Sequence, residues 1–219
     1  MSPLPIAILI SGRGTNMRVI AERAAAGSLP VDVRVVISDK SSAEGLQSAA
    51  AMNLATRVLE PRNFADRPSF DRALVELLAQ YQPQLIVLAG FMRILTPQFT
   101  GAFADRILNV HPSLLPKYPG LHTHRRALAA GEAVHGVSVH FVTEQLDGGP
   151  VVLQAEVPVL PGDTVATLSA RVQQGEHRIY PQAIDWFACG RLLLKEGRAW
   201  LDGQPLHAPL REPAPVAGG

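Results

Sequence analysis

The chain is poor in cysteine, in aromatic residues and in net charge. Its 219 residues include one cysteine, Cys189, which excludes an internal disulfide and a cluster of thiolate metal ligands. Aromatic residues make up 5% of the chain and the formal net charge is +1, so nothing in the overall charge attracts nucleic acid or a membrane surface. Hydrophobic residues make up 47%, which is typical of a globular protein.

Long apolar runs are also missing. No stretch reaches the roughly 18 residues that a membrane-spanning helix needs. The first residues, MSPLPIAILISG, carry no positive charge before their short apolar run, which favours a first strand over a signal peptide. We therefore expect a cytoplasmic protein with a single catalytic domain over residues 1–204. Residues 205–219, rich in proline and glycine, are expected to form a disordered tail.

The residues that are present alternate between strand-like and helix-like patterns. Continuous apolar runs bounded by turn residues predict buried strands, and apolar residues at helical spacing fill the segments between them. The predicted strands cover residues 5–11, 31–38, 55–59, 84–88 and 107–111, and the predicted helices cover residues 17–26, 43–52 and 69–81. Such alternation predicts a doubly wound α/β fold with a mostly parallel sheet and a Rossmann-like N-terminal half.

The second half of the chain follows another pattern. Residues 134–142 and 151–159 read as strands joined by a turn-rich loop, so we expect them to form an antiparallel edge of the sheet. Helical spacing then predicts a long helix over 164–188 with Asp163 as its cap, and residues 191–201 resemble a small hairpin.

A glycine-rich turn, Gly12-Arg13-Gly14-Thr15-Asn16, joins the first strand to the first helix. Backbone N–H groups at a helix N-terminus bind phosphate. The turn lacks the third glycine of a dinucleotide-binding fingerprint and the lysine of a P-loop, which favours a phosphate monoester. The alternative is a tight turn in which Thr15 or Asn16 caps the helix.

Two polar residues, Asn109 and His111, stand at the end of the fifth strand. They should project from the same face, because side chains two apart on a strand do so, and Pro112 ends the strand. An amide that donates a hydrogen bond and an imidazole that exchanges a proton can stabilise an oxyanion during acyl transfer. Asp147, in the loop after a neighbouring strand, would raise the pKa of the imidazole. The alternatives are a capped strand end and a turn aspartate before Gly148-Gly149.

The apolar loop 89–95 directly follows the fourth strand. Ligands of open α/β sheets bind beyond the carboxyl ends of the strands, so this loop and Arg93 could grip a flat molecule with a carboxylate. The alternative is a hydrophobic helix start that packs on the sheet. His122 and His124 form an H-x-H pair, but no third ligand stands at a suitable spacing, so we expect no metal.

Four motifs together resemble the phosphoribosylglycinamide formyltransferase family. They are ISGRGTN at residues 10–16, LAGFMRIL at 88–95, NVHPSLLPKYPGLHTH at 109–124 and HGVSVHFVTEQLDGGP at 135–150. The resemblance runs from about Pro5 to Gln204. It implies transfer of the formyl group of 10-formyltetrahydrofolate, the cosubstrate, to the amine of 5-phosphoribosylglycinamide in de novo purine (IMP) biosynthesis.

The resemblance also implies roles for individual residues. Asn109 and protonated His111 would stabilise the tetrahedral intermediate while Asp147 assists proton transfer, and His140 would support them. The implied contacts to the ribonucleotide are Gly14, Thr15, Asn16, Gln173 and Glu176. The implied folate contacts are Arg67, Leu88, Met92, Arg93, Ile94, Leu95, Asn109, Val142, Thr143 and Asp147. No metal, nucleic acid or membrane partner is implied, and a homodimer is left open.

Three other functions share parts of this pattern. Formyltetrahydrofolate deformylase passes the formyl group to water, and methionyl-tRNA formyltransferase passes it to an aminoacylated tRNA. Both carry a further domain, for which we see no segment, and the near-zero net charge argues against tRNA. A nucleotide-binding module without catalysis would explain the glycine turn alone and leaves Asn109, His111 and Asp147 without a purpose.

Overall fold

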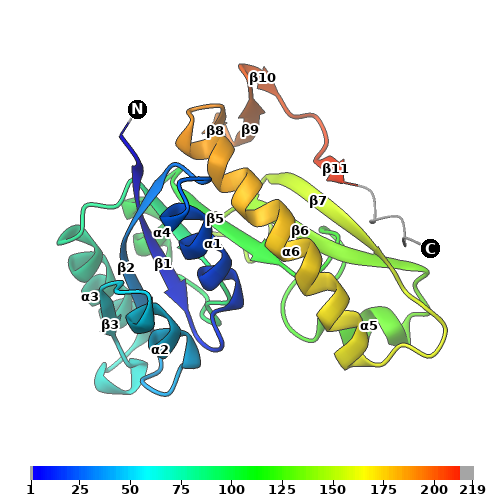
Figure 1. Cartoon of the computed structure of the whole chain (residues 1–219), viewed down its shortest axis with the longest axis horizontal. Coiled ribbons are helices and arrows are strands. Elements are labelled where there is room, and N and C mark those ends of the chain that lie inside the picture. The colour runs from blue at the N-terminus through cyan, green and yellow to red at the C-terminus, as the bar shows by residue number, and fades with distance from the viewer. Residues whose placement is uncertain (1, 213–219) are drawn as a thin grey trace.

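The computed structural model describes residues 2–212 and shows a mixed sheet in the order β11-β7-β6-β5-β4-β1-β2-β3 (Figure 1). Its strands are β1 (Leu4–Ile10), β2 (Val31–Ser38), β3 (Thr56–Val58), β4 (Leu85–Leu88), β5 (Ile107–His111), β6 (Val134–Phe141), β7 (Val151–Pro158) and β11 (Leu210–Glu212). The strands from β3 to β5 are parallel, and β6 runs antiparallel to both β5 and β7. The predicted mostly parallel α/β fold with an antiparallel edge is confirmed.

Helices cover both faces of the sheet. They are α1 (Thr15–Ala25), α2 (Glu44–Ala51), α3 (Arg67–Ala79), α4 (Pro97–Ala102), α5 (Thr123–Ala129) and α6 (Val165–Ala188), with a short 3-10 turn, η1 (Pro61–Asn63). A small antiparallel sheet contains β8 (Leu192–Lys195), β9 (Arg198–Leu201) and β10 (Gln204–Pro205). The predicted hairpin over 191–201 is therefore present as β8 and β9.

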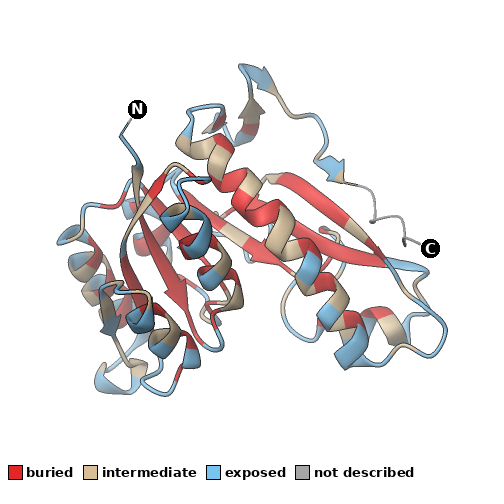
Figure 2. Cartoon of the chain, in the orientation of Figure 1, coloured by how far each residue is buried: buried red, intermediate tan, exposed pale blue. Residues whose placement is uncertain are grey.

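Alternate residues of β1 enter two separate hydrophobic cores. Ile8 belongs to the core that α1 and α6 cover, whereas Leu9 belongs to the core that α3 covers through Phe70 and Leu74. A strand buried on both faces needs a continuous apolar run, which explains IAILI in this stretch. Figure 2 shows the buried strands between helices whose outer faces are exposed.

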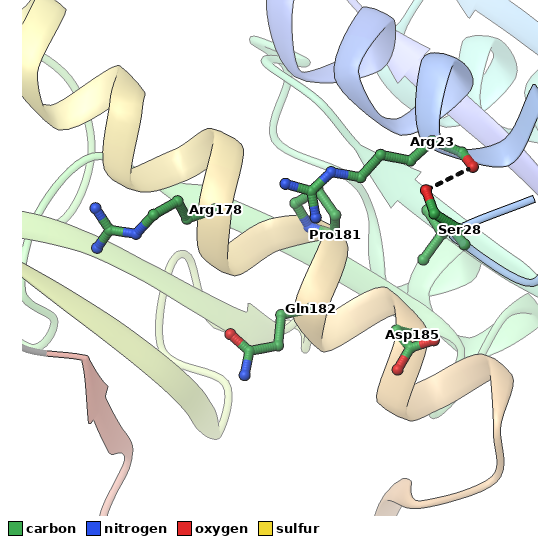
Figure 3. A pocket seen from close by; sticks show the side chains of 7 residues that line it. Arg23, Ser28, Arg178, Pro181, Gln182 and Asp185 are labelled. Atoms are coloured by element: carbon green, nitrogen blue, oxygen red, sulfur yellow. Dashed lines mark hydrogen bonds between the residues drawn. The ribbon is translucent and has the colours of Figure 1, made fainter. Parts of the chain in front are cut away.

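Helix α6 is joined to the sheet and to α1 by two unusual contacts. The fully buried hydroxyl of Tyr180 donates a shared hydrogen bond to the carbonyl oxygens of Leu88 and Leu108, at 3.0 and 2.8 Å. Pro181 lacks an N–H, so the carbonyl of His177 one turn earlier has no helical donor. Arg23 of α1 donates to that carbonyl at 3.3 Å, and Figure 3 shows its guanidinium beside Pro181.

The predicted Asp163 cap is wrong, and the capping alternative for the glycine turn does not hold. Gly14, with φ of 69°, precedes α1, and neither Thr15 nor Asn16 caps the helix. The N-cap of α6 is Thr164, which accepts a hydrogen bond from the N–H of Thr167, while Asp163 instead receives the guanidinium of Arg171.

Residues 205–212 differ from the expected disordered tail. Strand β11 pairs with β7 in parallel, and ion pairs join Arg211 to Glu156 and Arg178 to Glu212. The open edge of β7 offers unpaired backbone groups that a following segment can satisfy. Residues 213–219 lie outside the described residues, and the single catalytic domain over 1–204 stays a prediction. Among residues 2–212, no helix is long and apolar enough to cross a membrane.

Candidate active site

Asn109 on β5 faces His140 on β6, its partner in the antiparallel register. Nδ2 of Asn109 lies 3.0 Å from Nε2 of His140, and Nδ1 of His140 lies 2.8 Å from the carbonyl oxygen of Phe141. A carbonyl only accepts, so Nδ1 carries the proton and Nε2 accepts from the Asn109 amide. Burial lowers the pKa of His140 to about 4, although the Phe141 carbonyl and Asp147 oppose the shift. His140 is therefore neutral near pH 7 and holds one N–H of Asn109.

The carboxylate of Asp147 lies between two imidazoles. Its Oδ2 is 3.5 Å from Nδ1 of His111, and its Oδ1 is 3.8 Å from Nε2 of His140. The side chain is 9% exposed, and the N–H of Gly120 donates to Oδ2 at 2.8 Å. The structure thus brings together the predicted trio of Asn109, His111 and Asp147, with His140 as the link to Asn109.

The ring of His111 lies between two hydrogen-bond acceptors. Nε2 is 2.9 Å from the carbonyl oxygen of Tyr118, and Nδ1 faces Asp147. A carbonyl only accepts, so Nε2 of His111 carries the hydrogen of that contact. His111 is 6% exposed, so little water competes for these contacts.

A buried polar network holds the proline-rich loop after β5. The hydroxyl of Ser138 donates to the carbonyl of Ser113 at 2.7 Å and accepts from the N–H of Leu115 at 3.0 Å. Gln154 donates to Ser138 and to the carbonyl of Leu115, at 2.9 and 2.8 Å. Buried backbone groups of an irregular loop need such partners. These partners on β6 and β7 fix the loop that supplies the Tyr118 carbonyl and the Gly120 N–H.

A cavity of about 90 Å³ opens beside the trio, beyond the carboxyl ends of β4 and β5. Predicted folate contacts that line it are Leu88, Arg93, Ile94, Leu95, Asn109, Val142, Thr143 and Asp147. Phe91, His140, Glu144, Gln145 and Leu146 also line it. The sequence predicted loop 89–95, Thr143 and Asp147 as ligand contacts, but not Glu144, Gln145 or Leu146.

Two predicted folate contacts lie outside this cavity. Nη1 of Arg67 is 3.5 Å from the carbonyl oxygen of Ile94, and Met92 is 65% exposed. One water occupies roughly 30 Å³ of liquid, whereas pockets for drug-sized ligands measure about 300–1,000 Å³. The cavity is therefore smaller than a site that encloses a whole drug-sized ligand, and the rest of a longer ligand would cross the rim that holds Arg67 and Met92. Arg93 lies with its guanidinium 4.6 Å from the centroid of the Phe70 ring.

A second cluster of predicted residues joins the N-terminus of α1 to α6. Gln173 donates to the hydroxyl of Thr15 at 3.0 Å, and the amide of Asn16 donates to Glu176 at 2.7 Å. Burial raises the pKa of Glu176, against the opposing effects of Asn16 and Arg13. Among the described residues, the buried Oδ1 of Asn16 has no hydrogen-bond partner. The structure thus brings the predicted ribonucleotide contacts together at a helix N-terminus, where backbone N–H groups are free for an anion.

Ser11 connects the two clusters. Its N–H donates to the carbonyl of Gly90 at 3.1 Å, and its hydroxyl accepts from the N–H of Met92 at 2.8 Å. The glycine turn and the loop after β4 therefore lie side by side at the carboxyl edge of the sheet. Across residues 2–212, no group of three or more histidine, cysteine or acidic side chains could hold a metal ion.

Comparisons with known proteins agree with this geometry. The family model described as "Formyl transferase" matches residues 4–184. The chain is 53% identical over 201 residues to phosphoribosylglycinamide formyltransferase of Escherichia coli K12, covering 92% of this chain and 95% of the relative. The enzyme of Haemophilus influenzae is 48% identical over the same shares of both chains.

Solved structures are similar over nearly the whole chain. The phosphoribosylglycinamide formyltransferase of Coxiella burnetii, solved in complex with CHES, superposes with a TM-score of 0.90. It is 46% identical and covers 95% of this chain and 100% of its own. The resemblance seen in the sequence motifs is confirmed, and the chain belongs to the formyl transferase family.

Proposed function

We propose that the chain transfers the formyl group of 10-formyltetrahydrofolate to the amine of 5-phosphoribosylglycinamide, a step of IMP biosynthesis in the cytoplasm. The convergence of Asn109, His111 and Asp147 beside the cavity is the observation that carries this proposal. Relatives with this name match the chain along more than nine-tenths of both sequences.

The reaction forms one C–N bond and breaks another. The primary amine of the ribonucleotide attacks the formyl carbon, and negative charge develops on the formyl oxygen. The free N–H of Asn109 and the Nδ1–H of protonated His111, which makes an ion-pair contact of 3.5 Å but no hydrogen bond with Asp147, receive that charge, as preorganised donors do in other acyl transfers. His111, acting as general acid, gives a proton to the folate nitrogen as it leaves. The attacking amine loses a proton through a water that Asp147 orders, and that proton returns to His111.

Each substrate is proposed to bind at one of the two clusters. The phosphate of the ribonucleotide binds the N–H groups at the start of α1, where Gly14, Thr15 and Asn16 lie, and Glu176 and Gln173 contact the ribose and phosphate side. The ring system of the folate occupies the cavity. Ser11 sets these sites next to each other, so the amine and the formyl group can meet at Asn109.

A turnover assay tests this function against its alternatives. Purified protein is incubated with 10-formyltetrahydrofolate, with and without 5-phosphoribosylglycinamide. We expect formylated ribonucleotide and tetrahydrofolate in equal amounts, and neither product without the acceptor. Release of formate without an acceptor would instead identify a deformylase, and formylation of methionyl-tRNA in place of the ribonucleotide would identify the tRNA enzyme.

A further inference from the structure

Tyr118 supplies the carbonyl that holds His111, and its own side chain is held from the opposite side. Its hydroxyl donates to Oε1 of Glu132 at 2.8 Å. Lys117 donates to both oxygens of Glu132, at 2.8 and 2.9 Å. Glu132 lies between α5 and β6 and is not a member of the catalytic trio. A chain of contacts therefore runs from Glu132 through Tyr118 to His111.

The aromatic ring of Tyr118 is also enclosed. The guanidinium of Arg126 lies 5.2 Å from the ring centroid and donates to the carbonyl of Pro119 at 2.6 Å. The ring of His135 meets it edge to face, with centroids 6.2 Å apart. Tyr118 has φ of 55°, a conformation that a bulky residue rarely adopts unless its surroundings impose it. These side chains hold the backbone of Tyr118 in place.

We propose that Tyr118 and Glu132 are positioning residues that fix the ring of His111 at the angle needed for formyl transfer. The role of His111 in this inference rests on the proposed function. The contact between Nε2 and the Tyr118 carbonyl is 2.9 Å, whereas the ion-pair distance to Asp147 is 3.5 Å. The shorter contact orients the ring, because hydrogen bonds weaken steeply with distance and misalignment.

Electrostatics strengthens the bond between the two residues. Hydrogen bonds from Lys117 and Tyr118 lower the pKa of Glu132, while the bond to Glu132 raises the pKa of the Tyr118 phenol. Near pH 7 the contact is therefore a neutral phenol donating to an ionised carboxylate. Such charge-assisted bonds are shorter and stronger than neutral ones. A bond of this kind is suited to holding Tyr118 in place to within a fraction of an ångström.

Steady-state kinetics of a small set of variants tests the inference. Tyr118→Phe and Glu132→Ala each remove the phenol–carboxylate bond, and we expect kcat to fall by about tenfold, since small misplacements of a reacting group are costly. The KM values of both substrates should stay within about twofold, because neither residue belongs to a proposed binding site. Glu132→Gln keeps an acceptor for the phenol and should restore most of kcat. Lys117→Met leaves the bond intact and serves as the control.

A double-mutant cycle separates this coupling from general damage. Tyr118→Phe combined with Glu132→Ala should lose no more than either single variant, because both act through one contact. Additive losses in kcat, or a kcat of Tyr118→Phe equal to that of the parent protein, would overturn the inference. If the parent protein turns over no ribonucleotide, the proposed function fails instead.

An NMR measurement covers the case in which activity is absent or the folding of a variant is in doubt. The ring nitrogen signals of His111 report its hydrogen bonds. We expect them to shift in Tyr118→Phe and Glu132→Ala and to stay in place in Lys117→Met, with the backbone spectrum otherwise unchanged. Unmoved His111 signals in both folded variants would contradict the inference, and Glu132→Gln provides the same comparison if Tyr118→Phe unfolds.

Discussion

The amide of Asn109 and the ring of His140 form a hydrogen bond of 3.0 Å between β5 and β6. The carbonyl of Phe141 fixes the tautomer of His140, and the tautomer in turn requires the nitrogen of Asn109, not its oxygen, to point at the ring. One N–H of the amide is thereby occupied, and the other remains for a ligand in the cavity that Asn109 lines. The orientation of the proposed oxyanion donor thus depends on the neighbouring ring of His140.

Replacing His140 by phenylalanine should therefore lower kcat. The ring shape is kept, but the acceptor for Asn109 is lost, so the amide can turn its oxygen toward the developing negative charge. Loss of a whole oxyanion donor costs about 10²–10³ in kcat in other enzymes, so misorientation should cost at least about tenfold. Kinetics of His140→Phe beside His140→Gln, which retains an acceptor, provide the check. Equal kcat in all three proteins would contradict the orienting role.

The pH dependence of stability should carry the signature of His140. Burial lowers its pKa from the ordinary 6.5 to about 4, so the unfolded chain binds this proton more readily than the folded protein. The contribution of neutral His140 to the free energy of unfolding is fully present above about pH 6.5. It is lost as the pH falls toward 4, which lowers the free energy of unfolding by on the order of 3 kcal/mol. His135, whose pKa burial also lowers to about 4, adds to the same trend.

Urea unfolding at a series of pH values measures this effect. We expect the free energy of unfolding to drop between about pH 6.5 and 4, and the drop to be smaller in His140→Phe than in the parent protein. The comparison uses the slope with pH, so any constant destabilisation by the substitution cancels. An identical slope in both proteins would mean that folding does not shift the pKa of His140.

Removing the proposed acid or its carboxylate partner should abolish most turnover without unfolding the protein. His111→Ala removes the proton donor, and general acid–base groups contribute about 10²–10⁴ to rate. Asp147→Asn is the better test of the carboxylate, because φ of Asp147 is 48° and asparagine tolerates this conformation. We expect a loss of at least about 10² in kcat for each, with a circular dichroism spectrum like that of the parent protein. Near-normal turnover of either variant would refute the assignment.

The sequence was sufficient for the parts of the site that follow from strand ends. Buried runs locate the carboxyl ends of β4 and β5, and adjacent parallel strands bring those ends to one edge, so the loop 89–95 and His111 could be placed near each other. The contact between the side chains of Asn109 and His140 could not be predicted in this way. It depends on the register between β5 and β6, which a shift of one residue would reverse, and no local pattern determines that register.

The contacts that backbone groups make in the site could not be predicted from the sequence, for a different reason. The Tyr118 carbonyl and the Gly120 N–H contact His111 and Asp147, but every residue has such groups and no residue type marks them. The strands β10 and β11 were not predicted because two or three residues are too few to show an alternation of apolar and polar residues. The predicted cap of α6 is wrong because Asp163 and Thr164 can both cap this helix, and the ion pair with Arg171 engages Asp163.

The contact between Arg23 and the carbonyl of His177 should stabilise the fold only because of Pro181. In the parent protein, Arg23→Met should lower the free energy of unfolding by roughly 0.5–1.5 kcal/mol, the usual worth of one hydrogen bond. In a Pro181→Ala background the helix supplies its own N–H to that carbonyl, so the same substitution should cost less. Denaturant unfolding of the four proteins gives the coupling. A zero coupling energy would show that Arg23 acts through other contacts.

A methyl group at Gly45 should damage binding of the ribonucleotide from outside the site. An added Cβ would meet Cδ1 of Ile10 at 2.6 Å, the carbonyl oxygen of Gly12 at 3.1 Å and Cα of Gly14 at 3.1 Å. The N–H of Gly45 also donates to the carbonyl of Gly12 at 3.0 Å, so the start of α2 helps to fix the position of the glycine turn. Side chains can yield, but the backbone of the turn would have to move away from the phosphate it is proposed to bind.

Gly45→Ala should therefore raise KM for 5-phosphoribosylglycinamide by about tenfold, consistent with the cost of moving a binding group by a fraction of an ångström. The KM for 10-formyltetrahydrofolate should stay nearly constant, because the cavity beside Asn109 does not include this turn. Gly101→Ala is the matched control, since nothing lies within 4 Å of its added Cβ and it sits in α4. If both variants had the same KM for the ribonucleotide, the glycine turn would not be the phosphate-binding site. Only Gly45→Ala displaces the backbone of that turn.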